Sequence, residues 1–266
     1  PYTTLFRSSA AGMDKALMKK VFAGCGFPMM PYVDVTRHAY QADTEQWVEK
    51  MESLGYPLYV KPANLGSSIG ISRVENREAL KEAIQLAFAY DRKVVVEKGV
   101  ADAMEINCSV LGIADDCRAS LCEKPLGWKD FLTFEDKYLR GGKGKNAATR
   151  QIPAPIGEEM TDKIQTLAKQ IFTEMDCKGV VRIDFLVDNQ TGELYVNEIN
   201  TIPGSMAFYL WEPCGLSYGA LIDELVQIAK SAAEEKKKNS YAYDSSILQK
   251  VRSGGTKGTK GSKGAK

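Results

Sequence analysis

The sequence has few of the residues that enzymes pair into an activated nucleophile. It contains one histidine, His38, in a polar stretch, and none of its six cysteines forms a Cys-x-x-Cys pair. These features argue against Ser-His-Asp or Cys-His catalysis and against a zinc site. Any chemistry is therefore expected to use carboxylates, lysine, arginine, tyrosine or a metal.

Two further absences narrow the class of protein. No run of about 18 apolar residues occurs, which argues against a membrane-spanning helix. The 35 basic and 34 acidic residues nearly cancel, so the net charge of +1 gives no general case for nucleic-acid binding. The 44% of apolar residues is ample for a packed core. We therefore expect a folded protein with neither nucleic acid nor a membrane as partner.

The two ends of the chain differ from the rest. Residues 1–8, PYTTLFRS, resemble the translation of a sequencing-adapter oligonucleotide and are left out of the fold argument, with an ordinary N-terminal strand as the alternative. Residues 239–266 are predicted to form a flexible basic tail, because 252–266 has five basic residues, no acidic one and little apolar surface. The alternative is an arm that binds anionic partners.

Hydrophobic periodicity predicts strands and helices that do not alternate strictly, which is typical of an α+β fold. Asn76 is a predicted N-cap, and Met13, Leu17 and Val21 form an apolar stripe on the first helix. We expect two subdomains, 9–100 and 101–238, the second with a lid at 124–156. Helices are predicted at 13–24, 77–90, 158–175 and 217–238, and strands at 57–62, 70–74, 93–97, 105–112, 180–187 and 193–199.

The strongest candidate site is a hairpin with Arg-Ile-Asp at 182–184 and Asn-Glu-Ile-Asn at 197–200. Alternate residues of a strand share a face, which groups Arg182 with Asp184 and groups Leu194, Val196, Glu198 and Asn200. If the turn closes symmetrically, residues 187 and 193 pair and Arg182 lies opposite Glu198. Hard oxygen ligands of this kind suit Mg²⁺. A surface hairpin with a salt bridge is the alternative.

Three weaker motifs accompany this hairpin. The segment 60–70, Val-Lys-Pro followed by Leu-Gly-Ser-Ser-Ile-Gly, could fold over phosphates, or it is a plain hairpin turn. Glu97 and Lys98 end an apolar strand that could hydrogen-bond an adenine, or it is a solvated strand end. The segment Phe-Glu-Asp-Lys-Tyr at 134–138 could close over a reacting phosphate, or it is a solvated loop.

In this order and spacing, the motifs resemble those of the D-alanine–D-alanine ligases, in the ATP-grasp superfamily. The resemblance runs from about Ser9 to about Lys230 and includes Met-Asp-Lys at 13–15 and Asn-Glu-Ile-Asn-Thr-x-Pro-Gly at 197–204. It implies an ATP-grasp fold in which two α+β subdomains clasp ATP, with the family's N-terminal substrate domain missing.

The resemblance also implies the members of the site. The residues that bind ATP would be Lys15, Lys61, Ser67, Ser68, Glu97, Lys98, Val100, Glu105, Phe131 and Lys137. Phe134 would lie near the nucleotide. The catalytic residues would be Ser67, Lys137, Tyr138 and Arg182. Two Mg²⁺ or Mn²⁺ ions would be held by Asp184, Glu198 and Asn200, and the substrate would contact Gly204, Tyr209 and Leu210.

The implied reaction joins two D-alanine molecules through an acyl phosphate, for peptidoglycan precursors in the cytoplasm, by a protein that is a homodimer at full length. Tyr209 departs from the family, in which a serine at this position commonly binds the substrate carboxylate. The alternative is a related ligase that takes D-lactate or D-serine as its second substrate, although Tyr138 favours D-alanine over D-lactate. A third hypothesis is a non-catalytic nucleotide-binding module. This chain alone is expected to bind MgATP poorly and to ligate nothing, because the acidic anchor for the first ammonium lies in the N-terminal domain.

Overall fold

A computed structural model of the chain describes residues 7–66, 68–126 and 150–239. Internal contacts divide the chain into a large unit, Pro1–Ala229, and a short unit, Lys230–Lys266. The large unit contains two antiparallel β-sheets and the helices packed on them. Among the described residues, none of the helices has the length and apolar character that crossing a bilayer requires.

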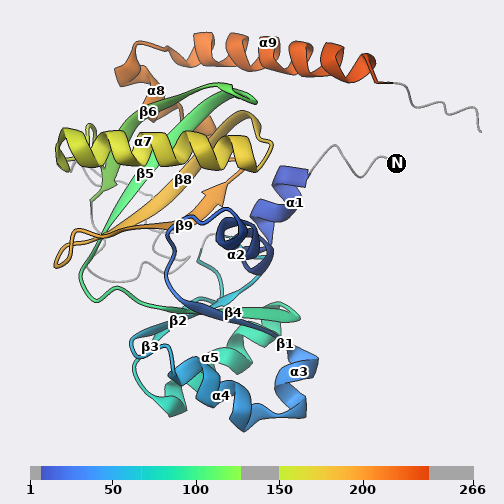
Figure 1. Ribbon diagram of the computed structural model, residues 1–266, viewed down its shortest axis with the longest axis vertical. Helices are drawn as coiled ribbons and strands as arrows, with labels where there is room; N and C mark the ends of the chain where they lie inside the picture. The colour runs from blue at the N-terminus through green and yellow to red at the C-terminus, as the bar shows by residue number, and fades with distance from the viewer. Residues whose placement is uncertain (1–6, 67, 127–149, 240–266) are drawn as a thin grey trace, which may run out of the picture. The chain divides into compact units, whose positions relative to one another are not determined.

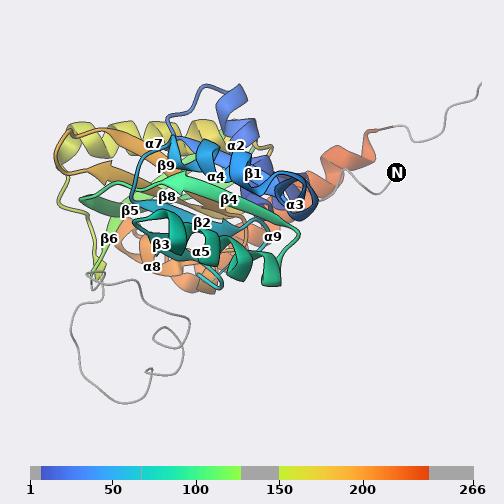
Figure 2. The same ribbon diagram turned by 90° about the horizontal axis from the view of Figure 1, so that it is seen from below.

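The first sheet has four strands in the order β1-β4-β2-β3. Its valines and leucine on one face pack against α4 and α5, which lie on the same side of the strands (Figure 1). In Figure 2 this sheet is seen from that side, with α5 in front of it. The elements are β1 (Tyr32–Thr36), α3 (Arg37–Ala42), α4 (Thr44–Glu52), β2 (Leu58–Pro62), β3 (Ser72–Val74), α5 (Arg77–Tyr90) and β4 (Lys93–Lys98).

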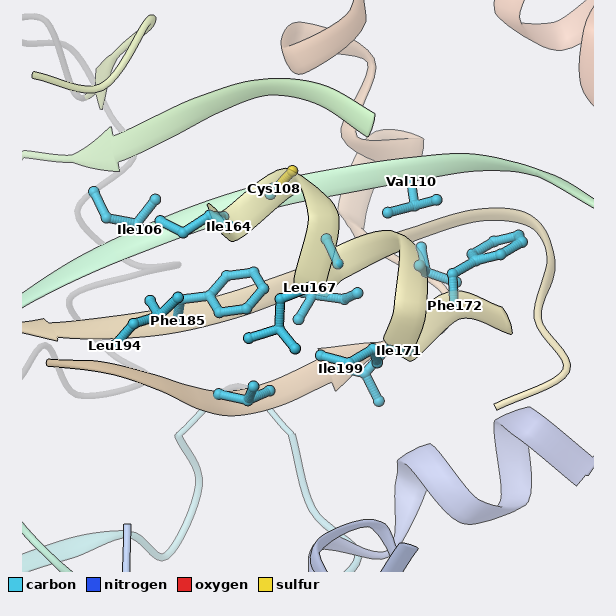
Figure 3. Close-up of a cluster of buried hydrophobic side chains, with 14 of the residues drawn as sticks. Ile106, Cys108, Val110, Ile164, Leu167, Ile171, Phe172, Phe185, Leu194 and Ile199 are labelled. Atoms are coloured by element: carbon cyan, nitrogen blue, oxygen red, sulfur yellow. The ribbon is translucent and has the colours of Figure 1, made fainter. Parts of the chain in front are cut away.

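The second sheet has five strands in the order β7-β6-β5-β8-β9. Helix α7 crosses one face of it (Figure 1), and Ile164, Leu167 and Ile171 of α7 pack against the strands, as Figure 3 shows. The elements are β5 (Ala103–Ile113), β6 (Asp116–Pro125), β7 (Arg150–Gln151), α7 (Gly157–Glu174), β8 (Lys178–Asp188) and β9 (Leu194–Asn200).

The face of this sheet opposite α7 carries a smaller cluster and the polar residues described below. Leu111 and Val180 of the strands pack there against Trp211 and Leu221, and the Trp211 indole donates a 3.1 Å hydrogen bond to Ser109. The remaining elements are α1 (Arg7–Met13), α2 (Lys15–Gly24), a 3₁₀ turn at Gly204–Ala207, α8 (Phe208–Trp211), a second 3₁₀ turn at Glu212–Cys214 and α9 (Tyr218–Lys237).

The prediction for helix 77–90 is confirmed to the residue. Helix α5 spans Arg77–Tyr90, and the Asn76 side chain accepts a 2.9 Å hydrogen bond from the Ala79 amide as its N-cap. This helix follows the sequence because capping and periodicity are both local features. Its predicted apolar stripe is buried: Leu80, Ala83, Ile84, Ala87 and Phe88.

The helix predicted over 13–24 is present as α2, which ends at Gly24 as expected, but its predicted apolar stripe and its first two residues are wrong. The helix breaks at Asp14, whose side chain caps α2, and Met13 and Leu17 are 60% and 44% exposed. The buried face of α2 instead carries Lys15, Lys19 and Phe22 among others. A stripe of apolar residues does not reveal such a face, because lysines are rarely buried unless they are paired.

Several other expectations need correction. The sequence analysis did not predict strands β1 and β6, although YVDVT and the first six residues of DCRASLCEKP alternate as a half-buried strand does. The predicted irregular lid 124–156 contains the end of β6 and all of β7, while residues 127–149 lie outside the described part. At the N-terminus, Arg7 and Ser8 begin α1, although residues 1–8 had been set apart from the fold.

Candidate active site

The strands β8 and β9 bring the expected acidic residues together, but in a register that differs from the prediction. Val187 pairs with Leu194 and not with residue 193, and Arg182 faces Asn200 and not Glu198. Asp184 is the direct partner of Glu198. The two carboxylates therefore lie side by side on neighbouring strands. The symmetric turn had instead placed Glu198 opposite Arg182, two residues away from Asp184.

A one-residue slip at the turn and a β-bulge at Asn197 together produce this register. The pairing shifts between Asp184–Glu198 and Phe185–Val196, so one residue of β9 has no partner in β8. Leu194, Val196 and Ile199 are buried in the core beneath α7. The prediction that Leu194 and Val196 share a face with Glu198 is therefore wrong, because the extra residue of a bulge reverses the alternation of faces.

Asp184 is the centre of the polar face. Its carboxylate accepts two 2.7 Å hydrogen bonds from the Arg182 guanidinium and one of 2.9 Å from the Asn200 amide. Burial raises the pKa of Asp184, and the charge of Arg182 opposes this rise. For Arg182, burial favours the neutral form, yet the charge of Asp184 outweighs it and raises the pKa. Such a bidentate pair fixes the plane of both groups.

Lysines from α2 and the four-stranded sheet face these carboxylates. Lys15 lies 3.6 Å from Glu198 and donates a 2.6 Å hydrogen bond to the Leu65 carbonyl. Lys61 donates a 3.0 Å hydrogen bond to Glu97, and its Nζ also lies 3.5 Å from the Asn197 amide oxygen. Lys15 and Lys61 thus lie close to the strand that carries Glu198, and only Lys15 forms an ion pair with that carboxylate.

Glu97 is shared between two buried lysines. Its carboxylate lies 3.0 Å from Lys61 and 3.3 Å from Lys19, a lysine that is 1% exposed. Burial favours the protonated acid, but the charges of both lysines outweigh it and lower the pKa of Glu97 to about 2. Burial also lowers the pKa of Lys19, while the pKa of Lys61 is raised because Glu97 and Glu198 outweigh its burial. Two cations against one carboxylate leave a positive charge here.

A cavity of about 260 Å³ lies between these groups. Nine of the residues predicted for the site line it: Lys61, Ser68, Glu97, Lys98, Val100, Glu105, Arg182, Asp184 and Glu198. Met30, Tyr59, Ile71, Leu186 and Asn197, which the sequence analysis did not single out, line it as well. A cavity that combines apolar side chains with converging charged groups is typical of a ligand site.

The other predicted residues lie near this cavity or outside the described part. Asn200 contacts Asp184, and Lys15 contacts Glu198. Gly204 begins the 3₁₀ turn after β9, and on α8 Leu210 is fully buried while the guanidinium carbon of Arg150 lies 3.7 Å from the Tyr209 ring centroid. Ser67, Phe131, Phe134, Lys137 and Tyr138 lie outside the described residues.

Lys19 and Asn197 are the main members of this region that the sequence analysis missed. Lys19 follows Lys15 by four residues, so both lysines lie on one face of α2, and that spacing was a usable signal. Asn197 was named only as part of a motif. No local signal predicts its contact with Lys61, because the bulge that turns it toward the cavity depends on strand pairing.

The donors fit a magnesium ion better than a metal that needs a complete protein cage. Within the described ranges, no three His, Cys, Asp or Glu side chains come together. Mg²⁺ is commonly bound by one or two carboxylates with phosphate oxygens and water completing the shell. Asp184 and Glu198 supply two carboxylates on adjacent strands, and Asn200 adds an amide beside them.

Solved structures define the class of this fold. The D-alanine–D-alanine ligase from Coxiella burnetii matches 93% of this chain and 63% of its own chain, with a TM-score of 0.72 and 27% identity. The D-Ala:D-Ser ligase VanG from Enterococcus faecalis matches 84% and 63%, with a TM-score of 0.69 and 30% identity. The two sheets, with the cavity between them, thus form the ATP-grasp fold.

The family follows from sequence comparison. A family model described as the D-ala D-ala ligase C-terminus matches residues 21–227. The D-alanine–D-alanine ligase of Thermoanaerobacter sp. (strain X514) is 43% identical over 233 residues, which cover 86% of this chain. The chain belongs to the D-alanine–D-alanine ligase family. It spans about 63% of the length of that relative.

Proposed function

We propose that this chain is the nucleotide- and metal-binding part of an ATP-dependent ligase that joins two D-alanine molecules. The observation that carries the proposal is the cavity in which Arg182, Asp184 and Glu198 face Lys61. Clustered lysines suit a polyphosphate, and paired carboxylates suit the cation that accompanies it. The names of the related ligases support D-alanine as the substrate.

Each wall of the cavity receives a role in this proposal. Lys15 and Lys61 would hold phosphate oxygens, since both already lie beside Glu198 or Asn197. Asp184, Glu198 and Asn200 would hold magnesium, which when bound neutralises charge on the phosphates. The end of β4, from Lys98 to Val100, would contact the adenine, and Glu97 would keep Lys19 and Lys61 in position.

The proposed reaction has two steps. The carboxylate of the first D-alanine attacks the γ-phosphorus of ATP, and ADP leaves with the bonding electrons. The amine of the second D-alanine then attacks the acyl carbon, phosphate leaves, and the amine loses a proton. Negative charge develops on oxygen in both steps, so the Arg182 guanidinium, which stays protonated, is suited to stabilise it.

The biological setting follows from this reaction as part of the proposal. The product would be a peptidoglycan precursor, and ATP as substrate points to a cytoplasmic enzyme. D-alanine would be the only small-molecule partner besides the nucleotide. A homodimer of the full-length protein is proposed on the family resemblance alone.

The test measures binding and turnover separately. MgATP binding is followed by calorimetry on the chain itself. Phosphate release and dipeptide are measured with ATP and D-alanine on this chain and on a fusion to the N-terminal region of the Thermoanaerobacter relative. We expect release that requires D-alanine in the fusion. A panel of D-lactate and D-serine as second substrates identifies the acceptor.

Matched variants complete this test. Glu198→Gln should weaken MgATP binding at least about tenfold, because it removes one of two carboxylates for the cation. Glu193→Gln changes an exposed glutamate directly before strand β9, and this variant should bind MgATP as the unaltered chain does. Equal binding by both variants, or phosphate release that ignores D-alanine but follows another acceptor, would overturn the proposal.

A further inference from the structure

Arg150 lies on the polar face of the five-stranded sheet, at the opposite edge from the strand that carries Glu198. It belongs to β7, where it pairs with Pro125 of β6. Because alternate residues of a strand share a face, Pro125 is on the same face as Glu123, and Arg150 shares that face. The Arg150 side chain lies 3.6 Å from the Glu123 carboxylate, which agrees with this placement.

The strand register connects this face to the two carboxylates of the candidate magnesium site. Four direct cross-strand partners form one row across β6, β5, β8 and β9, which we call the polar row: Glu123, Asn107, Asp184 and Glu198. Neighbouring strands lie about 4.8 Å apart, so Glu123 and Asp184 are about 10 Å apart along the row. Arg150 is thus at one end of the polar row, and the candidate magnesium site is at the other.

Two other side chains restrict the orientation of the Arg150 guanidinium. Its carbon lies 3.7 Å from the ring centroid of Tyr209 on α8, a stacked contact that arginine commonly makes with aromatic rings. Its Nε lies 3.6 Å from Glu123, whose buried carboxylate also accepts a 3.2 Å hydrogen bond from the Asn107 amide. An aromatic ring and a fixed, buried acid therefore hold this guanidinium in place.

The Arg150 guanidinium can still bind a ligand. At 3.6 Å, its contact with Glu123 is an ion pair without a hydrogen bond, so within the described ranges its N–H groups donate to no carboxylate. The Arg150 side chain is 40% exposed, whereas Arg182 donates two hydrogen bonds to Asp184. A planar guanidinium binds a carboxylate through two parallel hydrogen bonds. Arg150 is therefore suited to an incoming carboxylate.

The proposed reaction leaves one carboxylate that needs such a partner. The first D-alanine uses its carboxylate to form the acyl phosphate, which would lie beside Asp184 and Glu198. The second D-alanine reacts through its amine and keeps its own carboxylate as a negative charge. The phosphates repel that charge, so it is most stable away from them and next to a cation. An acyl phosphate followed by one amino acid can span the polar row.

We propose that Arg150 binds the carboxylate of the second amino acid, while Tyr209 and Glu123 hold its guanidinium in place. The inference rests on the proposed ligase function and deepens it, because it names the residue that selects the acceptor. The acceptor is then an α-amino acid with a free carboxylate. D-alaninamide has the same amine and methyl group but lacks the charge that Arg150 recognises, so it should be a poor acceptor.

Competition between two acceptors tests the inference in the fusion described above. ATP, D-alanine and D-alaninamide are mixed, and the ratio of dipeptide to dipeptide amide is measured by mass spectrometry. This product ratio reports the ratio of the two kcat/KM values. We expect Arg150→Met to shift the ratio toward the amide by about tenfold or more, because it removes hydrogen bonds between charged groups.

Arg118→Met is the matched control for this competition. Arg118 also forms an ion pair with a glutamate, Glu224, and also lies against a ring of α8, 5.5 Å from Trp211. Its substitution therefore removes the same kinds of contact at another place on the sheet, and the product ratio should not change. An unchanged ratio in Arg150→Met, or an equal shift in both variants, would overturn the inference.

A second measurement needs neither turnover nor a variant. Phenylglyoxal, which modifies exposed guanidinium groups, is added to the fusion with MgADP, and the modified arginines are identified by mass spectrometry. A saturating concentration of D-alanyl-D-alanine should slow the modification of Arg150 at least about threefold. The C-terminal amide of this dipeptide should not, because it lacks the carboxylate. Arg118 should react at one rate in all samples.

The two measurements separate the inference from the proposed function. Equal modification of Arg150 with the dipeptide and with its amide would overturn the inference even if D-alanine is ligated. Protection by the dipeptide alone, in a fusion that does not ligate D-alanine, would support Arg150 as the carboxylate-binding residue and reject the proposed function.

Discussion

Asp184 of β8 and Glu198 of β9 are direct cross-strand partners, so their carboxylates lie on one face of the sheet. Two like charges in this arrangement repel each other unless cations lie close by. Arg182 is bonded to Asp184, and Lys15 lies 3.6 Å from Glu198. Cations from two different parts of the chain therefore keep both carboxylates charged. Burying several charged groups together costs free energy, and such clusters are typical of functional sites.

Replacing Asp184 by asparagine should affect stability as well as binding. The change leaves the half-buried Arg182 without its counter-charge, and breaking such a pair commonly costs about 3 kcal/mol. We expect a lower free energy of unfolding in urea and a loss of stabilisation by added MgATP. Asp223→Asn, at an exposed position of α9, serves as the control and should change neither. Unchanged stability of Asp184→Asn would contradict the pairing.

The pKa of Glu97, about 2, predicts a specific pH dependence. A carboxylate whose pKa is lower in the folded state than in the unfolded state stabilises the fold above its unfolded pKa of about 4.5. That contribution is lost as the pH falls from about 4.5 through about 2. Unfolding free energies measured across this range should decline in the unaltered chain, and less steeply in Glu97→Gln. Glu49→Gln, at an exposed glutamate, should follow the unaltered chain.

Substitution of Glu97 and substitution of its partner Lys19 should lower the free energy of unfolding by unequal amounts. At pH 7, Glu97→Gln leaves Lys19 and Lys61 buried without their acid and should cost about 3 kcal/mol. Lys19→Met leaves one lysine for one carboxylate and replaces a buried cation by an apolar chain of similar length, so it should cost less than about 1.5 kcal/mol. Urea unfolding of both variants checks the order. A larger loss for Lys19→Met would show that Lys61 alone does not neutralise Glu97.

The turn after β9 predicts a stabilising substitution. Ser205, Met206 and Ala207 have φ values of 53°, 54° and 51°, so three consecutive residues with side chains are in the left-handed region. Each costs about 1 kcal/mol relative to glycine. Ser205 is exposed, and Ser205→Gly should raise the unfolding free energy by about 1 kcal/mol. The control Ser231→Gly, within α9, should instead lower the unfolding free energy, since glycine weakens a right-handed helix.

Elements specified by neighbouring residues could be predicted from the sequence. Helix α5 has its apolar stripe within its own fourteen residues and its cap, Asn76, directly before them, and the prediction was correct at both ends. Lys61, Glu97, Arg182, Asp184 and Glu198 were also recognised as site residues, and all five line the cavity. The hairpin residues follow from residue type and spacing, whereas Lys61 and Glu97 were assigned through the resemblance to the ligase family; neither step needs knowledge of what lies opposite.

The partners across the cavity were decided by the tertiary structure alone. The slip at the turn and the bulge at Asn197 together made Glu198 the partner of Asp184, and no local feature of the sequence indicated either. The burial of Lys19 depends on Glu97, 78 residues away along the chain, and the Tyr209 ring lies against Arg150, 59 residues earlier in the chain. The amino-acid sequence by itself determined which charged groups are available and which local elements carry them. Packing decided which charges share a carboxylate, because the free energy of a buried ion depends on the neighbours that replace its water.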